Sequence, residues 1–311
     1  MTASALARQL ERFGPDQQHH PPMSLAAARK YCRGLAQSHY ENFTVASWLL
    51  PRRLRSHFHA VYAYCRWADD LADETESPQQ SLELLTWWES QLQACYAGHA
   101  THPVFIALAA TIQQFAIPAT PFHDLLVAFR RDQTQQRYAS LDDLLDYCRY
   151  SANPVGRLVL YLGECCDARR AALADKICTG LQLVNFWQDI GRDWQRGRLY
   201  VPADRMAEHG VARHDFDAER ATPALRALLA EEVDRARGYL LSGLPLASLM
   251  PGRLRFDIEL FARGGLAVCD AIEKIGYDVL HQRPALSRGR KIRLALAALP
   301  RFGALREKGD R

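Results

Sequence analysis

The stretch His59–Glu74, HAVYAYCRWADDLADE, is the part of the sequence that best indicates the fold. Its apolar residues recur at helical spacing, and at about 100° per residue its main polar residues fall within roughly 60° of one another. That face carries a tyrosine, an arginine and two aspartates, namely Tyr62, Arg66, Asp69 and Asp73. Asp70 flanks them, so we predict an amphipathic helix with an acidic face.

A second stretch, Leu181–Trp194, repeats the arrangement in LQLVNFWQDIGRDW. Its spacing also places four polar residues on one helical face, namely Gln182, Asn185, Asp189 and Asp193. Like charges four residues apart weaken a helix by about 0.2–0.5 kcal/mol, and an unpaired carboxylate among aromatic and aliphatic neighbours is costly. We therefore expect cations beside both aspartate pairs, although a single helical D-x-x-x-D motif is also common on solvated surfaces.

Magnesium suits these carboxylates, because it takes oxygen ligands, keeps most of its waters and bridges carboxylates to phosphates. The histidines show no spacing typical of a zinc site. Paired aspartates with Mg2+ predict a diphosphate substrate whose carbon–oxygen bond ionises. Aromatic side chains near the two stretches would either stabilise the resulting carbocation or simply pack the core. They are Tyr40, Phe43, Tyr62, Tyr64, Trp67, Tyr147, Tyr150, Phe186 and Trp187.

The pattern of the whole sequence predicts an all-helical protein that forms one domain over residues 1–311. Segments rich in Ala, Leu, Arg, Gln and Glu repeat apolar residues at helical spacing, and alternating β-branched runs are scarce. Prolines mark the expected helix breaks, among them Pro78, Pro103, Pro202 and Pro223. No Gly/Ser-rich linker and no internal repeat divides the sequence.

Composition excludes several classes of protein. The 311 residues are 48% apolar and 24% charged, which is typical of a globular core rather than of a disordered chain. The net charge of +4 is too small to indicate nucleic acid as a partner. The sequence has no signal peptide, no C-x-x-C pair and no apolar stretch of about 18 residues, so we expect a cytoplasmic protein.

The positive charge is concentrated near the C-terminus. Residues 283–311 hold nine Lys or Arg against two Asp or Glu. The tail 284–311 mixes these cations with Leu, Ile and Phe. We expect it either to contact an anionic membrane surface at the inner face or to form a solvated terminal helix with a frayed end.

Four segments in a fixed order resemble the squalene and phytoene synthases, which join or rearrange prenyl diphosphates head to head. They are the approach to Leu49-Leu50-Pro51, then YCRWADDLADE, DYCRYSANPVG and LQLVNFWQDIGRDWQRGRLYVP. The resemblance covers residues 30–290 and implies the all-α isoprenoid synthase fold, with a central cavity between two aspartate-bearing helices. It also implies a diphosphate leaving group and roughly two or three Mg2+ ions.

The resemblance further implies roles for individual residues. The metal ligands would be Asp69, Asp70, Asp73, Asp189 and Asp193. The substrate-binding residues would be Arg66, Tyr62, Phe43, Gln182, Asn185, Gln188 and Arg283. Tyr147 matches a tyrosine that lies near the reacting centre, which makes it a candidate catalytic residue.

Two departures from the usual family pattern indicate a particular branch. Where members that make carotenoids and squalene usually read Ser-x-Ser-Phe, this chain has Tyr40-Glu41-Asn42-Phe43, and Gln188 replaces the usual arginine. In these features the chain resembles the hydroxysqualene synthases of bacterial hopanoid pathways. That resemblance implies presqualene diphosphate as substrate and capture of the carbocation by water. We expect Glu41 or Asn42 to position that water.

Water capture needs no hydride, so we expect no NADPH, and no G-x-G-x-x-G follows a predicted strand. The functional partners would be the enzymes that make presqualene diphosphate and that reduce hydroxysqualene. Two other interpretations stay open. The protein could condense two prenyl diphosphates into presqualene diphosphate, dehydrosqualene or phytoene, or it could be a non-catalytic helical scaffold whose aspartates form structural ion pairs.

Overall fold

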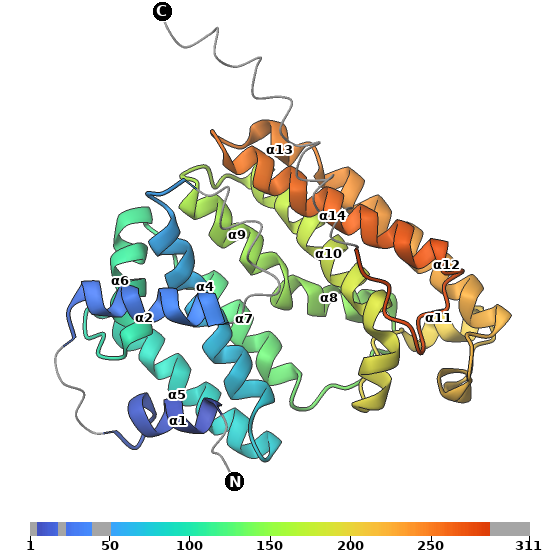
Figure 1. The fold of residues 1–311 in the computed structure, drawn as a ribbon, viewed down its shortest axis with the longest axis horizontal. Helices are drawn as coiled ribbons and strands as arrows, with labels where there is room; N and C mark the ends of the chain where they lie inside the picture. The colour runs from blue at the N-terminus through green and yellow to red at the C-terminus, as the bar shows by residue number, and fades with distance from the viewer. Residues whose placement is uncertain (1–4, 18–22, 39–50, 287–311) are drawn as a thin grey trace, which may run out of the picture. The chain divides into compact units, whose positions relative to one another are not determined.

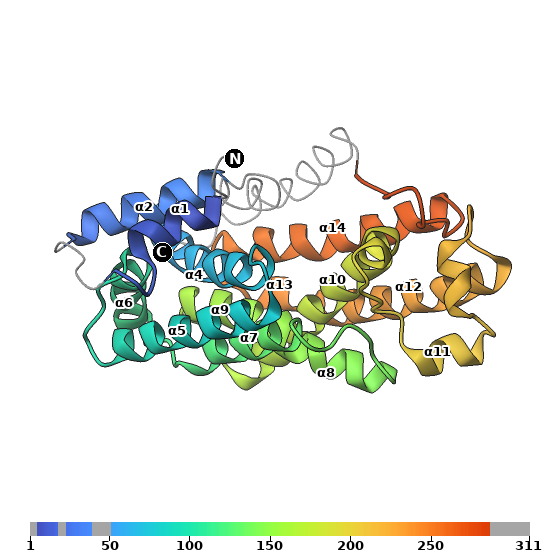
Figure 2. The same ribbon diagram turned by 90° about the horizontal axis from the view of Figure 1, so that it is seen from below.

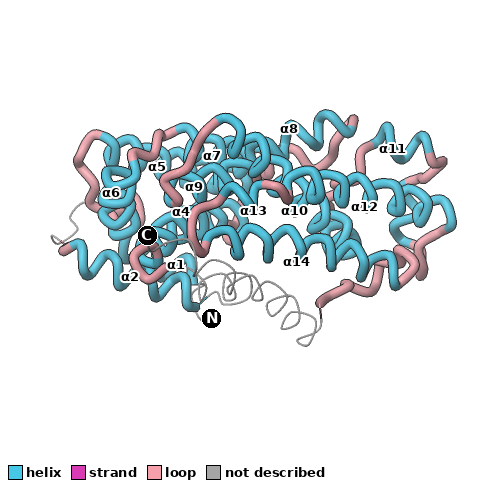
Figure 3. The backbone as a smooth tube through the Cα atoms, turned by 90° about the horizontal axis from the view of Figure 1, so that it is seen from above, coloured by secondary structure: helices cyan, strands magenta, loops and turns pink. Residues whose placement is uncertain are grey.

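The computed structural model describes residues 5–17, 23–38 and 51–286, and helices connected by loops make up these residues (Figure 3). Within this part of the chain, β-type pairing is limited to an isolated bridge between Arg137 and Leu199. The prediction of an all-helical fold is therefore confirmed. Within the described ranges, none of the helices combines the length and the apolar composition that a membrane crossing requires.

The described chain divides into two compact units. The first unit holds the residues up to 135 together with 157–166, and the second holds 136–156 and the described residues from 167 onward. Helix α9 (Asn153–Leu162) begins in the second unit and ends in the first. That the chain forms a single domain stays a prediction.

The first unit is a group of short and medium-length helices (Figure 1). Its helices are α1 (Ala5–Phe13), α2 (Leu25–Ser38), α4 (Arg55–Asp73), α5 (Pro78–Tyr96), α6 (Pro103–Phe115) and α7 (Thr120–Arg131). Helix α4 packs against α2, α5, α6 and α7. It is therefore the central helix of this unit.

Aromatic rings fill the interior beside α4. The indole of Trp67 stacks on that of Trp88, with ring centroids 5.2 Å apart. The hydroxyl of Tyr64 donates a hydrogen bond to the backbone carbonyl of Phe122 at 3.0 Å. Tyr64 and Trp67 are fully buried, so these two aromatic residues pack the core.

The second unit is organised by three long helices that lie side by side (Figure 2). They are α10 (Ala168–Gln195), α12 (Pro223–Gly243) and α14 (Leu254–Lys274). Shorter elements complete the unit, namely α8 (Leu141–Ser151), α11 (Ala203–Glu208), the 3-10 helix η1 (Arg213–Asp217) and α13 (Leu246–Leu249).

A buried ionic cluster fixes α10 against α12. The fully buried carboxylate of Glu232 accepts hydrogen bonds from Arg205 at 2.7 Å and from Arg235 at 3.1 Å. The indole nitrogen of Trp187 on α10 donates to the backbone carbonyl of the same glutamate at 3.1 Å. A buried carboxylate that is paired in this way holds its neighbours in one arrangement, because losing a partner would leave a charge uncompensated.

Prolines start several of these helices, as the sequence predicts. Pro78, Pro103 and Pro223 each occupy the first helical position, where the missing N–H has no intrahelical partner to lose. The residue before each of them caps the helix through its side chain. The Ser77 hydroxyl, for example, accepts from the backbone N–H of Gln80 at 3.2 Å.

One buried carboxyl makes the stability of the second unit depend on pH. Asp257, in the first turn of α14, is 3% exposed. Neither of its carboxylate oxygens has a hydrogen-bond partner among the described residues. Burial raises the pKa of Asp257 to about 7 from an ordinary value of 3.8. The stabilisation that comes with protonation is therefore complete below about pH 4 and is lost as the pH rises through 7.

We expect Asp257→Asn to be more stable than the wild type at about pH 8, by roughly 1–3 kcal/mol, because it removes a buried charge. The difference should shrink towards about pH 4.5, where the wild-type carboxyl is protonated. Urea unfolding at both pH values measures it. Asp234→Asn, at a side chain that is 78% exposed, is the matched control. Equal stability of Asp257→Asn and the wild type at both pH values would contradict this account.

Candidate active site

The acidic face of α4 is centred on one arginine. The Arg66 guanidinium forms ion pairs with Asp69 at 3.0 Å, with Glu74 at 3.5 Å and with Asp70. Asp69 is half-buried and Asp73 is exposed. The predicted cation beside these carboxylates is therefore present in the chain itself. Arg66 is three-quarters buried, with a side chain that is 24% exposed.

Asp70 differs from its neighbours because it lies on the buried side of α4. Its side chain is 6% exposed. Burial raises the pKa of Asp70 to about 7, in spite of the neighbouring Arg66 guanidinium. One turn before Arg66, burial also raises the pKa of the half-buried Tyr62 phenol. Tyr62, Arg66 and Asp69 are therefore half-buried, Asp70 is buried beside them, and the charge of Arg66 only partly offsets the effect of burial on the pKa of Asp70.

Helix α10 presents the second set of predicted residues. Gln182 is half-buried, Asn185 is exposed, and Asp189 and Asp193 follow on the next two turns, both half-buried. Burial, and then the charge of Asp189 one turn away, raise the pKa of Asp193 to about 6. The carboxyl of Asp193 is therefore protonated more readily than a solvated aspartate, although the charges of Arg198, Arg196 and Arg192 act in the opposite direction.

The segment that follows α14 returns to α10 and brings a cation to this pair. The Arg283 guanidinium contacts both carboxylate oxygens of Asp189, one of them through its NH2 group at 2.9 Å. The buried Gln188 side-chain amide donates to the backbone carbonyl of Pro284. Gln188 therefore binds the backbone next to Arg283, and Arg283 supplies a positive charge beside the first aspartate of the pair.

Gly191 makes this return possible. A Cβ atom placed on Gly191 would lie 1.8 Å from the backbone carbonyl oxygen of Leu280. No side chain fits in that space, so the residue must be glycine for the segment to lie directly on the helix.

An aromatic cluster surrounds the predicted catalytic tyrosine. Tyr147, on α8, is 4% exposed, and its ring centroid lies 6.2 Å from that of Phe186 on α10. Tyr200 stacks on Phe186 with centroids 4.0 Å apart and planes 10° apart. Tyr138 lies 5.5 Å from Tyr147 and stacks on Tyr200 at 5.7 Å. The site therefore contains two aromatic residues, Tyr138 and Tyr200, that the sequence analysis did not single out.

A short backbone pairing explains how these rings meet. The Leu199 N–H donates to the Gln136 carbonyl at 3.0 Å, next to the isolated bridge between Arg137 and Leu199. The pairing places Tyr138, which follows Arg137, beside Tyr200, which follows Leu199. Tyr200 belongs to the RLYVP end of the last family segment, which is the signal that could have identified it.

Three predicted site residues, Glu41, Asn42 and Phe43, lie outside the described residues, as does the tail from residue 287 onward. Their predicted roles stay predictions.

The donor set of both helices fits a hard divalent cation. Each helix offers carboxylate oxygens, and burial, followed by the charge of Asp189, raises the pKa of Asp193 on α10. Within the described ranges, no three Asp, Glu, His or Cys side chains lie close enough together to hold a metal by themselves. Magnesium tolerates this, because it takes one or two carboxylates and completes its shell with water and phosphate oxygens.

The architecture is the all-helical isoprenoid synthase fold, which solved squalene and dehydrosqualene synthases share. The squalene synthase HpnC from Alicyclobacillus acidocaldarius is similar with a TM-score of 0.79 and 45% identity, over 83% of this chain and 97% of that one. The family model of squalene/phytoene synthase matches residues 36–290. The chain therefore belongs to the squalene/phytoene synthase family.

Relatives within this family carry two different activities in their names. A hydroxysqualene synthase from Sinorhizobium fredii is 35% identical over 232 residues, which cover 73% of this chain and 78% of that enzyme. A phytoene synthase from Arthrospira platensis is 29% identical over 285 residues, which cover 87% of this chain and 92% of that enzyme.

We expect Gly191→Ala to displace the segment around Leu280 and to destabilise the protein by roughly 1–3 kcal/mol, because the added methyl group has no space. Loss of the contact should also expose the peptide bond after Leu280 to faster cleavage by chymotrypsin. Urea unfolding and timed proteolysis measure the two effects.

The matched control is Gly238→Ala on α12, where a Cβ atom would meet nothing within 4 Å. This variant should be more stable than the wild type by about 0.5–1 kcal/mol, because alanine favours the helix. If Gly191→Ala were as stable and as resistant to chymotrypsin as Gly238→Ala, the described path of the segment would be wrong.

Proposed function

We propose that the protein is a Mg2+-dependent hydroxysqualene synthase. It would ionise presqualene diphosphate, allow the cyclopropylcarbinyl cation to rearrange to the 1-1′ linked skeleton, and let water capture the allylic cation. Hydroxysqualene and diphosphate would be released. The observation that carries the proposal is the 45% identity to the squalene synthase HpnC. The similarity to the hydroxysqualene synthase of Sinorhizobium fredii supports it.

The aspartates of the two helices are the proposed metal ligands, namely Asp69, Asp70, Asp73, Asp189 and Asp193. Bound Mg2+ would neutralise the diphosphate as the carbon–oxygen bond breaks. Arg66 and Arg283 lie beside these carboxylates, so either guanidinium can exchange a carboxylate for a phosphate oxygen. The uncharged Gln188, through its bond to the Pro284 carbonyl, helps to keep Arg283 at the site.

The aromatic cluster suits the carbocation chemistry. Tyr147 and Phe186 are buried, and Tyr200 covers the Phe186 ring. The faces of such rings stabilise positive charge without forming a bond to it. A buried aromatic surface also excludes water that would capture the cation before it has rearranged.

The final step needs one positioned water molecule, and Glu41 or Asn42 is proposed to bind it. The Glu41 carboxylate can accept a proton from that water, and the Asn42 amide oxygen can accept a hydrogen bond from it. Either contact orients a lone pair of the water oxygen towards the cation. If neither residue has this role, Glu41→Gln and Asn42→Ala will form hydroxysqualene at the wild-type rate and in the wild-type proportion.

The proposed reaction needs no NADPH, because water rather than hydride captures the cation. The partners would be the enzymes that supply presqualene diphosphate and reduce hydroxysqualene. The product is a hydrophobic alcohol, so we further propose that the cytoplasmic enzyme contacts the inner face of the membrane through its basic tail. Equal partitioning onto anionic liposomes after truncation before Arg288 would argue against that contact.

A second candidate is the condensation of two prenyl diphosphates, as in a phytoene synthase. It is favoured by the Arthrospira platensis relative, which matches a larger share of this chain, 87%, than the Sinorhizobium fredii enzyme does, 73%. The two candidates differ in the number of substrate molecules, so feeding experiments separate them.

With Mg2+ and without NADPH, we expect the purified protein to convert presqualene diphosphate to hydroxysqualene and to leave farnesyl and geranylgeranyl diphosphate unchanged. Mass spectrometry of the extracted lipids measures this. Asp189→Asn should reduce turnover about a hundredfold or more, because the metal ion that neutralises the departing diphosphate would lose a carboxylate ligand. The control Asp234→Asn should turn over at the wild-type rate. Consumption of farnesyl or geranylgeranyl diphosphate alone, with presqualene diphosphate untouched, would favour the condensing enzyme.

A further inference from the structure

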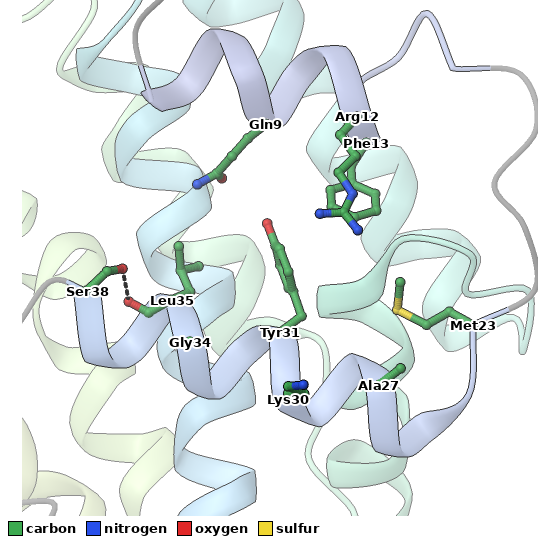
Figure 4. Close-up of a pocket in the computed structure, with 10 residues that line it drawn as sticks. All are labelled: Gln9, Arg12, Phe13, Met23, Ala27, Lys30, Tyr31, Gly34, Leu35 and Ser38. Carbon is green, nitrogen blue, oxygen red and sulfur yellow. Dashed lines mark hydrogen bonds between the residues drawn. The ribbon is translucent and has the colours of Figure 1, made fainter.

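A pocket separate from the residues discussed above opens between α1 and α2 in the first unit (Figure 4). Its volume is about 490 Å3, which lies within the range of small-molecule sites. Phe13, Met23 and Leu35 supply apolar walls, while Arg12 on α1 and Lys30 on α2 supply cations. None of the proposed catalytic residues lines it.

A glycine keeps one wall of this pocket open. Gly34 lies within α2, where glycine weakens a helix relative to alanine. A Cβ atom at this position would meet nothing within 4 Å, so packing against the protein does not require glycine here. The residue instead leaves space beside the pocket, into which a larger side chain would project.

The hydroxyl of Tyr31 is the polar donor that the pocket offers to a ligand besides its two cations. It points from α2 towards α1 (Figure 4) and accepts a hydrogen bond from the Trp67 indole at 3.0 Å. Burial raises the pKa of Tyr31 to about 12, so the phenol stays protonated and keeps its own hydrogen to donate.

The charge around the pocket favours an anion. The described residues 5–17 and 23–38 carry five cations, Arg8, Arg12, Arg29, Lys30 and Arg33, against the carboxylates of Glu11 and Asp16. The Arg12 guanidinium lies over the Phe13 ring, 4.8 Å from its centroid. Within the described part of the chain, neither Arg12 nor Lys30 pairs with a carboxylate. Both remain available to a negatively charged headgroup.

We propose that this pocket binds an amphiphile that has an apolar chain and a phosphate headgroup. The chain would contact Phe13, Met23 and Leu35, and the phosphate would lie between Arg12 and Lys30, with Tyr31 as an additional donor. A soluble prenyl phosphate and an anionic membrane lipid share this chemistry. The site goes beyond the proposed function, since it uses none of the residues assigned to the reaction.

Calorimetric titration of the full chain with farnesyl monophosphate, in the absence of Mg2+, tests the proposal. The wild type should bind one molecule, and farnesol, which lacks the phosphate, should bind much more weakly. Gly34→Leu should reduce the affinity for farnesyl monophosphate about tenfold or more, because the leucine side chain fills the pocket. The double variant Arg12→Ala, Lys30→Ala should reduce it about as much, because it removes the contacts to the phosphate headgroup. Gly34→Ala, which adds a single methyl group, is the matched control and should bind within about twofold of the wild type. Circular dichroism establishes that each variant is folded.

A second titration, with a short-chain phosphatidylglycerol kept below its micelle concentration, distinguishes the two sources of the ligand, because a monomeric lipid offers the basic tail no membrane surface. If this lipid binds the wild type and Gly34→Ala but not Gly34→Leu, the ligand is a membrane lipid. If all three proteins bind this lipid equally or not at all while only Gly34→Leu loses farnesyl monophosphate, the ligand is a soluble prenyl phosphate. The proposal is wrong if the wild type binds neither probe, or if Gly34→Leu binds both as tightly as Gly34→Ala does.

Discussion

Carboxylates that are crowded on one helix and partly withdrawn from water are the constraint on which the candidate site depends. On α10, burial and the charge of Asp189 raise the pKa of Asp193 to about 6. On α4, burial raises the pKa of Asp70 to about 7 even though Arg66 pairs with it. Helices tolerate such crowding only when other contacts hold them in place. For α10 these include the hydrogen bond from Trp187 to Glu232, which is itself held by two arginines.

The constraint also explains why cations gather at these positions. Arg66 contacts three carboxylates of its own helix, and Arg283 arrives from the far end of the chain to contact Asp189. On each helix, metal ions and phosphate oxygens would satisfy the carboxylates and the arginines. This chemistry agrees with membership of the squalene/phytoene synthase family.

The spacing of residues along the sequence predicts much of the helical fold and of the candidate site. The i, i+4 aspartates of α4 and α10 and the helices that begin at Pro78, Pro103 and Pro223 all follow from patterns within a few residues. The contact of Arg283 with Asp189 joins residues 94 positions apart, and Gly191 could not be linked to Leu280 from sequence periodicity. The meeting of Tyr138 with Tyr200 depends on a single backbone bridge, which leaves no repeat in the sequence. Among the aromatic residues, spacing alone could not separate Trp67, which packs the core, from Tyr147.

The number of divalent ions that the protein binds together with inorganic diphosphate tests the central claim most directly. Electron paramagnetic resonance can count Mn2+ as a substitute for Mg2+. We expect the wild type to bind roughly two or three ions. Two double variants should bind fewer, one that combines Asp69→Asn and Asp73→Asn on α4 and one that combines Asp189→Asn and Asp193→Asn on α10. Asp234→Asn should bind as many as the wild type. If both double variants are folded and bind as many Mn2+ ions as the wild type, the aspartates are not the metal ligands and the account is contradicted.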